Sequence, residues 1–471
     1  CDKQLEEVPK SFLSPNNFFN TEAEGVLAVN GVYRLIPDLF KSTGFWGVTE
    51  NGCDDIMVKL YGNVAETYQY DAANTGGANS VWNYSYSTIM NANMVLARLP
   101  KSPIKEEMKN RLMGEALFIR GMHYYFLANT FGDVPLWTNE LDIAVVSTMG
   151  RSPLSEVRAQ IKKDLIEAAG YLPNKFTGAD VGRANKAAAL LLLARQYMIE
   201  KNWAEAKAAA TTVSKMTEYS LMPNYADLFD IKKRNVAESV MEIQFLRDAA
   251  TSMNYITNDR YTFFMPPSDS PGVFAGVNFG NSKLRSYEVF YPSVKFVNYF
   301  EAGDKRRNVV LADGFNGKPF NRMNQYNNMP FFGSKFWDLD ASDYYSGKNL
   351  PFLRFAEAFL ILAETENELG NTTVAHTWIN KTRERAGIAP LSGLSQSQMR
   401  EAIQKERAIE FCGEFQRRWD LIRWGKLIET VKSVAADNPE GAANIREHHL
   451  LFPIDENELI KNSALEQNPG Y

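Results

Sequence analysis

Residues 193–213 read LARQYMIEKNWAEAKAAATTV, and their pattern of small and apolar residues determines the fold class of this chain. The repeating positions are Leu193, Ala194, Tyr197, Ala206, Ala210 and Val213. Their helical spacing predicts two helices, over 184–200 and 203–216. The small residues between them allow two antiparallel helices to approach closely.

The same pattern returns in the second half of the chain. The offset between Ala194 and Ala206 recurs between Ala363 and Ala375, and Ile379 follows four residues later. Tetratricopeptide units place small and apolar residues at these offsets. A single helix pair cannot bury its apolar face alone, so the pairs must pack on each other. We therefore predict a mainly α-helical fold, an interrupted tetratricopeptide-like solenoid that carries a loop-rich, minor-β face.

The remaining helices follow from amphipathic periodicity and from Gly and Pro stop signals. They are expected at 20–40, 81–99, 105–130, 152–172, 352–370, 373–387, 395–413 and 414–433. Two stretches, 41–80 and 223–350, are rich in Gly, Asn and aromatic residues, with a short strand expected at 240–245. We expect one domain over 1–471. Its parts are a tether at 1–20, an N-terminal helical half at 21–220, an irregular ligand-binding region at 221–350, and C-terminal helix pairs with a tail at 351–471.

Composition narrows the class of partner. Among 471 residues, 45% are hydrophobic and 23% are charged, which is typical of a globular protein. The net charge of -5 and the absence of a Lys/Arg block argue against a nucleic-acid partner. Aromatic residues reach 12%, and many Tyr and Trp lie in polar loops. A ring with a polar tip suits a wet binding surface.

The three cysteines are Cys1, Cys53 and Cys412. Their odd number and wide spacing argue against a disulfide framework, although pairing of Cys53 with Cys412 stays open. The chain starts at Cys1, and we expect this residue to be a lipid-bearing cysteine left by lipoprotein processing. Since no apolar run approaches the ~20 residues of a membrane span, membrane association would depend on acyl chains.

Several sequence blocks resemble the SusD/RagB family over nearly the whole chain. The N-terminal blocks are Gly31-Val32-Tyr33, Asp54-Asp55, Asn91-Ala92-Asn93, the stretch Gly114 to Gly121 and Phe131-Gly132-Asp133-Val134-Pro135. The C-terminal blocks are Leu353-Arg354-Phe355-Ala356-Glu357, the stretch Asn380 to Gly387, Arg418-Trp419-Asp420, Leu451-Phe452-Pro453-Ile454 and Gln467-Asn468-Pro469-Gly470-Tyr471. Phe355 replaces the commoner Tyr of the family pattern.

This resemblance implies a non-catalytic lipoprotein on the outer leaflet of the outer membrane. It implies four tetratricopeptide-like helix pairs, an oligosaccharide ligand without a cofactor, and a SusC-type TonB-dependent transporter as partner. Some relatives handle peptides, so peptide capture is the alternative. A glycoside hydrolase is a third hypothesis.

A sugar needs an aromatic face bounded by polar side chains, and both irregular stretches contain such residues. The candidate glycan-binding residues are Trp46, Tyr70, Asn74, Asn79, Tyr255, Arg260, Tyr261, Phe274 and Trp337. Since each aromatic contact adds modest energy, we expect binding in about the micromolar to millimolar range.

Charged motifs in the helices are interpreted as structural. Glu115, Arg120, Arg354, Glu357, Glu410, Arg418 and Asp420 have the spacing of pairs that hold helices in register. No carboxylate pair is singled out as a glycosidase dyad, and the four histidines show no metal spacing. Asp338, Asp340 and Asp343 are a weak candidate for Ca²⁺, but a solvated acidic loop is the favoured interpretation because the loop lacks the Gly and Glu of an EF-hand.

Overall fold

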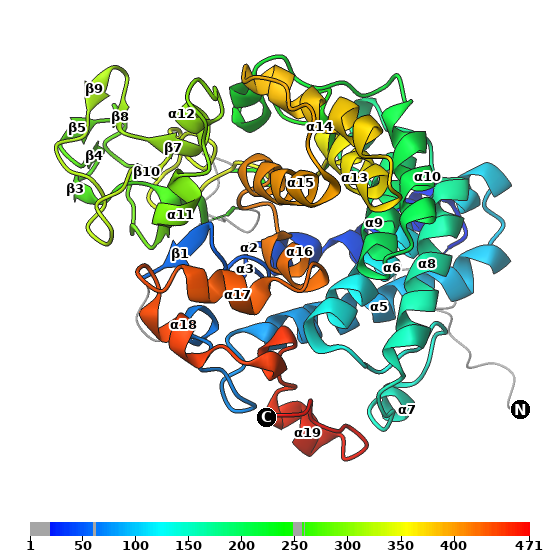
Figure 1. Ribbon diagram of the computed structural model, residues 1–471. Helices are drawn as coiled ribbons and strands as arrows, with labels where there is room; N and C mark the ends of the chain where they lie inside the picture. Colours follow the sequence, from blue (N-terminus) through cyan, green and yellow to red (C-terminus); the bar gives the residue numbers. More distant parts are fainter. Residues whose placement is uncertain (1–18, 60–62, 248–256, 259) are drawn as a thin grey trace, which may run out of the picture.

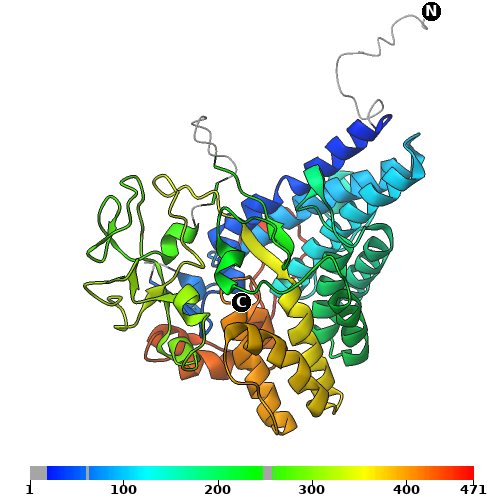
Figure 2. The same cartoon turned by 90° about the horizontal axis from the view of Figure 1, so that it is seen from above.

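The computed structural model describes residues 19–59, 63–247, 257–258 and 260–471. Helices stack on one side of the molecule, and short strands and loops form a lobe on the other (Figure 1). The same division is seen from above, where residues of the irregular region lie apart from the helix stack (Figure 2). The first part of the stack contains α1 (Glu22–Tyr33), α2 (Ile36–Lys41), α3 (Thr43–Thr49), α4 (Val64–Thr67), α5 (Ala78–Arg98), α6 (Glu106–Phe131), α7 (Ile143–Val146) and α8 (Leu154–Tyr171).

The predicted helix pairs are confirmed. They are α9 (Lys186–Ile199) with α10 (Trp203–Ser214), and α13 (Phe355–Glu368) with α14 (Thr372–Ala386). Ala194, Ala206, Ala363 and Ala375 are all fully buried. A methyl group at these positions lets neighbouring helices approach closely, as the repeat pattern requires. The C-terminal part continues with α15 (Gln396–Glu410), α16 (Arg417–Arg423), α17 (Leu427–Ser433), α18 (Pro439–Asn444) and α19 (Glu456–Lys461).

Two expected helices are divided in the structure. The helix expected at 20–40 breaks between α1 and α2, where Pro37 occupies the first turn of α2. Proline lacks the N–H that a continuous helix needs and favours a new first turn. The helix expected at 414–433 divides into α16 and α17 at Gly425, whose φ is +69°. That backbone conformation ends a right-handed helix and favours glycine.

Strands join segments that lie far apart in the sequence. β2 (Ser239–Ile243) pairs antiparallel with β11 (Leu350–Arg354), so the expected strand is confirmed and its partner leads directly into α13. β1 (Ile56–Val58) pairs antiparallel with β6 (Phe290–Pro292). The latter pair joins the two irregular stretches. The other strands are β3 (Ser268–Ser270), β4 (Val273–Phe274), β5 (Val277–Asn278), β7 (Leu311–Ala312), β8 (Gly314–Phe315), β9 (Lys318–Pro319) and β10 (Phe331–Phe332).

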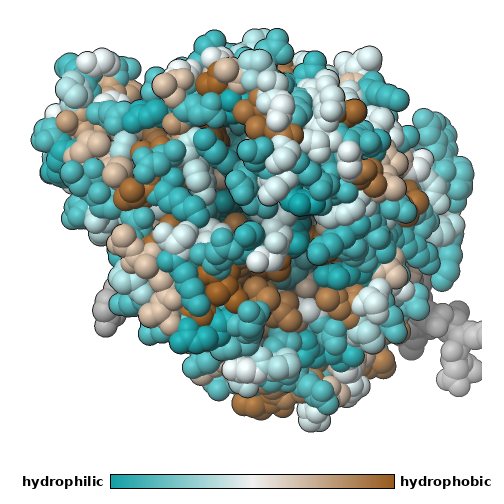
Figure 3. Space-filling model, viewed as in Figure 1, coloured by the Kyte–Doolittle hydropathy of each residue, from teal (hydrophilic) through white to brown (hydrophobic). Residues whose placement is uncertain are grey.

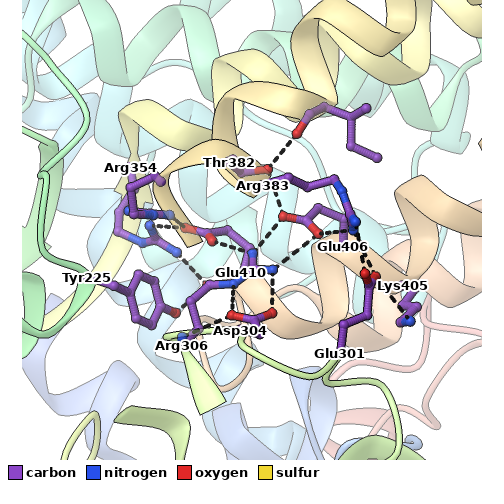
Figure 4. A network of polar contacts seen from close by, with 12 residues as sticks. Tyr225, Glu301, Asp304, Arg306, Arg354, Thr382, Arg383, Lys405, Glu406 and Glu410 are labelled. Carbon is purple, nitrogen blue, oxygen red and sulfur yellow. Dashed lines mark hydrogen bonds and ion pairs between the residues drawn. The ribbon is translucent and has the colours of Figure 1, made fainter. Parts of the chain in front are cut away.

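A buried ion network joins the helices to this lobe (Figure 4). Arg354 ends β11 and donates from Nη1 to Glu410 Oε1 at 2.8 Å and to Glu238 Oε1 at 2.7 Å. Arg306 of the lobe reaches Glu410 Oε2 at 3.1 Å and Glu406 Oε1 at 2.6 Å. Burial alone would raise the pKa of Glu410, but Arg385, Arg354 and Arg306 hold it well below its ordinary value.

The other charged motifs also pair across the fold, and Glu115 and Asp420 pair within one helix as well, with Arg111 and Arg423. Arg120 on α6 pairs with Asp164 on α8 at 2.6 Å, and Arg195 on α9 pairs with Glu357 on α13 at 2.7 Å. Arg418 donates to the hydroxyl of Tyr68 at 3.1 Å and to the carbonyl of His449 at 2.7 Å. These charges hold neighbouring elements together, in agreement with their interpretation as structural.

Two cysteines and one carboxyl group are buried in the core near the start of β1. Cys53 and Cys412 are free, buried thiols. The N–H of Gly52 donates to Glu66 Oε2 at 2.6 Å. Burial raises the pKa of Glu66 to about 7, although the hydrogen bond from Gly52 opposes this shift. None of the helices in the described part of the chain combines the length and hydropathy that a membrane span requires.

Substitution Glu410→Gln tests the ion network. It leaves Arg306, Arg354 and Arg385 without a shared buried counter-charge, which costs about 3–5 kcal/mol when one partner of a buried pair is removed. We expect a clearly lower urea midpoint by circular dichroism. Glu401→Gln, an exposed position on the same helix, is the matched control and should unfold like the wild type. Equal midpoints for both variants would contradict this role.

Substitution Glu66→Gln tests the raised pKa. The folded protein keeps this carboxyl protonated up to about pH 7, while the unfolded chain ionises it near 4.5. Wild-type stability is therefore lost as pH rises through this window, by about 3 kcal/mol. The free energy of unfolding of Glu66→Gln, relative to wild type, should increase by that amount between pH 4.5 and 8. A difference that does not change with pH would refute the assignment.

Candidate functional site

A cavity of about 190 Å³ lies where the β1–β6 pairing brings the two irregular stretches together. Helices α3 and α4, the loop at 74–77, the 3₁₀ turn Arg260–Phe264 and strands β1 and β6 contribute to it. Its lining residues are Thr43, Trp46, Asn51, Val58, Asn63, Val64, Asn74, Gly76, Gly77, Arg260, Phe263, Val289 and Phe290. Both stretches that were expected to carry ligand residues therefore meet in one place.

Backbone contact between two glycines sets one wall of this cavity. A Cβ atom at Gly44 would lie 2.0 Å from the carbonyl oxygen of Gly77, which no side chain tolerates. Gly77 itself has a φ of +92°, in the region that favours glycine. The loop at 74–77 can therefore lie directly against α3, and this brings Asn74 to the rim of the cavity.

The polar lining consists mainly of neutral groups. Asn51, Asn63, Asn74 and Thr43 supply amides and a hydroxyl, and Arg260 is the one charged residue among the lining residues. The Oδ1 atom of Asn51 is buried and has no hydrogen-bond partner among the described residues. A ligand hydroxyl could donate to this oxygen, which would offset the cost of burying it unpaired. No Asp or Glu belongs to the described lining.

An exposed aromatic surface adjoins the cavity. The Arg260 guanidinium lies 4.4 Å from the centroid of the Phe263 ring. Phe263 contacts Tyr287 edge to face at 5.2 Å, and Tyr287 stacks on Tyr344 at 4.0 Å. Tyr287 is 52% exposed. The stacked pair thus presents an aromatic face to solvent beside the amide-lined cavity.

Three of the predicted residues line this cavity: Trp46, Asn74 and Arg260. Trp46 is only 1% exposed and donates from Nε1 to the Phe40 carbonyl at 3.0 Å. Its ring packs against Phe290 and Phe264. Trp46 is therefore part of the cavity floor, and the exposed aromatic side chain beside the cavity is Tyr287 instead.

The other predicted residues lie elsewhere. Tyr70 is buried, where its hydroxyl donates to the His449 carbonyl at 3.2 Å. Tyr261 is buried and donates to the Asn349 carbonyl at 3.1 Å, and Phe274 is fully buried. Asn79 lies in the first turn of α5 and does not line the cavity. Trp337 lines a different and larger cavity. Tyr255 and Cys1 lie outside the described residues.

The three aspartates considered for Ca²⁺ have separate roles. Asp338 accepts from Ser346 Oγ at 2.7 Å and from the Gly347 N–H at 3.1 Å. Asp343 pairs with Arg285 at 3.0 Å, and Asp340 is exposed. Across the ranges that the structure describes, no cluster of three His, Cys, Asp or Glu residues could hold a metal ion. The calcium alternative has no support in this geometry.

The site residues that were not among the predicted ones include Asn51, Asn63, Phe263 and Tyr287. Asn51 precedes Gly52, and such a dipeptide signals a turn but not a ligand contact. Asn63 caps α4 by accepting from the Glu66 N–H at 3.2 Å. Phe263 and Tyr287 come together where the Val289 N–H donates to the Phe263 carbonyl at 3.0 Å, a contact that no local pattern reveals.

Two family models match this chain. One, described as the SusD family, matches residues 316–471, and the other, described as starch-binding and associating with the outer membrane, matches residues 46–198. Residues 199–315 lie between the matched ranges and include Arg260, Phe263 and Tyr287.

Relatives and solved structures agree with these matches. SusD-like protein P25 of Formosa agariphila is 28% identical, covering 100% of this chain and 96% of its own length. The starch-binding protein SusD of Bacteroides thetaiotaomicron is 26% identical, and the match covers 77% of this chain and 73% of the relative.

A SusD homologue from Bacteroides thetaiotaomicron has a TM-score of 0.83 at 23% identity, covering 97% of this chain and 98% of its own. A laminarin-binding SusD-like protein has a TM-score of 0.80 at 22% identity, covering 96% and 100%. At these identities the structural likeness shows the fold, which is the tetratricopeptide-like helical fold predicted from the repeat. The two matching family models, together with the relatives that cover this chain over its full length, indicate a SusD-like family member.

Proposed function

We propose that this protein captures oligosaccharides at the cell surface, at the cavity between α3 and β6, and does not cleave them. The observation that carries the proposal is the combination of an amide-lined cavity with the stacked Tyr287–Tyr344 pair, in which Tyr287 is exposed. A sugar ring presents C–H groups on its face and hydroxyls at its edge. The tyrosine pair suits the face, and Asn51, Asn74 and Arg260 suit the hydroxyls.

The chemistry of the lining favours binding over hydrolysis. A glycosidase needs two carboxyl groups about 5–10 Å apart across the scissile bond. The described lining of this cavity contains none, and the nearby Asp54 is tied to Arg417 at 2.8 Å. Asp55 and Glu50 are buried behind the cavity wall. These acids are arranged as parts of the core.

The names of similar proteins suggest which glycans to test first. A structural neighbour is named as binding laminarin, another is in complex with laminarihexaose, and a relative is named as binding starch. All three ligands are glucose polymers. We therefore propose a glucan as the first candidate ligand for this chain, with a peptide as the competing class.

We further propose that Cys1 carries a lipid anchor at the outer membrane and that a SusC-like transporter receives the ligand. One matching family model is described as associating with the outer membrane, which supports this location. An exposed group of apolar side chains supports a protein partner. This α7–α19 apolar surface consists of Leu141, Ile143, Val145 and Ile460.

The α7–α19 apolar surface lies at one end of the molecule. Ile143 is 73% exposed and Ile460 is 80% exposed. The two segments are linked, since Asn462 Nδ2 donates to the Met149 carbonyl at 2.8 Å. The space-filling view shows hydrophobic residues at this lower edge of the molecule (Figure 3). Exposed apolar groups of this kind mark interaction surfaces.

Glycan binding is tested by Tyr287→Ala and Arg260→Ala against laminarihexaose and maltohexaose in isothermal titration calorimetry. Loss of the stacking face or of a charged donor should weaken binding about tenfold or more, equal to about 1.4 kcal/mol. Tyr345→Ala is the matched control, because Tyr345 is also exposed but takes no part in the cavity or the stacked pair.

Unchanged affinity in both variants would disprove the site. Release of reducing sugar by the wild type would disprove the non-catalytic assignment. Binding of a peptide library, with no affinity for either hexasaccharide, would favour the competing ligand class.

The partner surface is tested by the double variant Ile143→Asp, Ile460→Asp in co-purification with a SusC-like transporter of the same organism. Two charges on an apolar interface should reduce recovery of the complex several-fold, because each must be desolvated. Ile166→Asp, an exposed apolar position on α8 away from this surface, is the control. Equal recovery of all three proteins would argue against this surface.

A further inference from the structure

A second cavity in the described chain lies apart from the candidate glycan site. It has a volume of about 880 Å³, within the range of about 300–1,000 Å³ typical of small-molecule pockets. The 3₁₀ turn Tyr225–Phe229 and the next three residues form one wall. Helix α12 (Arg307–Val310), strand β7 and the hairpin β8–β9 form another, and the loop at 334–340 completes it. The hairpin lies at the outer end of the loop-rich lobe (Figure 1).

The floor of this cavity is apolar and aromatic. Trp337 is 6% exposed and packs against Phe279 at 5.3 Å and Phe315 at 6.1 Å. Phe229 and Leu311, which also line the cavity, are buried. The Nε1 atom of Trp337 is buried and has no hydrogen-bond partner within the described ranges. Such an unpaired donor costs about 1–3 kcal/mol, which an acceptor oxygen reaching it would offset.

The rim offers donors and acceptors in similar numbers. Its carboxylates, amides and ammonium groups come from Asp227, Asp230, Asp313, Asp340, Asn308, Asn316, Lys232 and Lys318. Two of the carboxylates are already neutralised, since Asp227 pairs with Lys233 at 2.8 Å and Asp313 pairs with Arg307 at 2.6 Å. The remaining rim therefore carries two carboxylates and two lysines. This balance favours a neutral ligand that both donates and accepts hydrogen bonds.

We propose that this cavity is a second saccharide-binding site, which holds a neutral segment of an oligosaccharide. An apolar floor with a buried indole donor and a mixed polar rim is the chemistry that a sugar's ring face and hydroxyls require. This second site rests on the proposed function only for its ligand class, a saccharide. Its residues are different from those of the candidate glycan site. Two weak sites on one chain strengthen capture of a polymer through effective concentration.

The two cavities are separate, and aromatic contacts connect the regions of their tryptophans. They have no lining residue in common. Phe264 contacts Trp46 of the first site at 5.5 Å and stacks on Phe336 at 4.0 Å, and Phe336 directly precedes Trp337. Each site thus has its own tryptophan in its wall, and variants at each site separate a direct shift from one transmitted through Phe264 and Phe336.

Indole signals in a ¹⁵N-tryptophan-labelled sample test this proposal. Trp46→Phe and Trp337→Phe assign the two signals by removing one each. The wild type is titrated with laminarihexaose and maltohexaose, and both signals should shift. The exposed rim pair Asn308→Ala, Asp340→Ala should weaken the apparent affinity at Trp337 about tenfold and leave that at Trp46 within about twofold. Arg260→Ala should weaken the apparent affinity at Trp46 and leave that at Trp337 nearly unchanged. The control Glu401→Gln should change neither affinity.

A second variant protects the test against indirect effects. Ser334→Phe fills the second cavity from an exposed position and should abolish the Trp337 shift. A shift at Trp46 without one at Trp337 would overturn the second site and leave the proposed function standing. A Trp337 shift that survives both the Asn308→Ala, Asp340→Ala pair and Ser334→Phe would also overturn the second site. Such a shift would be transmitted from the first site through Phe264 and Phe336. No shift at either tryptophan would overturn the proposed function and this inference together.

Discussion

Arg354 holds the two halves of this protein together from a position where almost no solvent reaches it. Arg354 ends β11, which leads directly into α13. Its partner Glu238 lies at the start of β2, Glu410 ends α15, and Glu414 lies in the turn after α15. A guanidinium buried at this depth is stable only when every nearby carboxylate is in place. Glu410 also pairs with Arg306 of the lobe at 3.1 Å, so this network ties the loop-rich lobe to the helix stack. The glycan site depends on that link because part of the site comes from each.

This constraint explains why a binding surface can be built from loops. Loops tolerate changes in length and sequence, but a binding site needs side chains in fixed positions. Here the loops are tied at several points: by the β1–β6 pairing, by the close contact of Gly44 with Gly77, and by Glu66 beneath the Asn51 turn. The ligand-facing side chains can then vary while the buried charges that hold the scaffold stay constant.

The helical part of the fold could be predicted because its signal is local and repeated. The offset between Ala194 and Ala206 returns at Ala363 and Ala375, and all four are buried as the pattern requires. The site could be predicted only as a region. Trp46 was chosen for its ring and its loop-rich surroundings, but its burial depends on Phe264, Phe290 and Phe415, which are far away in the sequence. Tyr287 carries no local signal, and its exposure follows from tertiary contacts alone.

The central claim is that one cavity between the two irregular stretches binds a glycan without cleaving it. A crystal structure of the protein soaked with laminarihexaose tests this most directly. The account predicts an intact sugar chain against Tyr287, with hydroxyls on Asn51, Asn74 or Arg260. Density for the sugar on the helical face only, or for shortened cleavage products in the cavity, would contradict it.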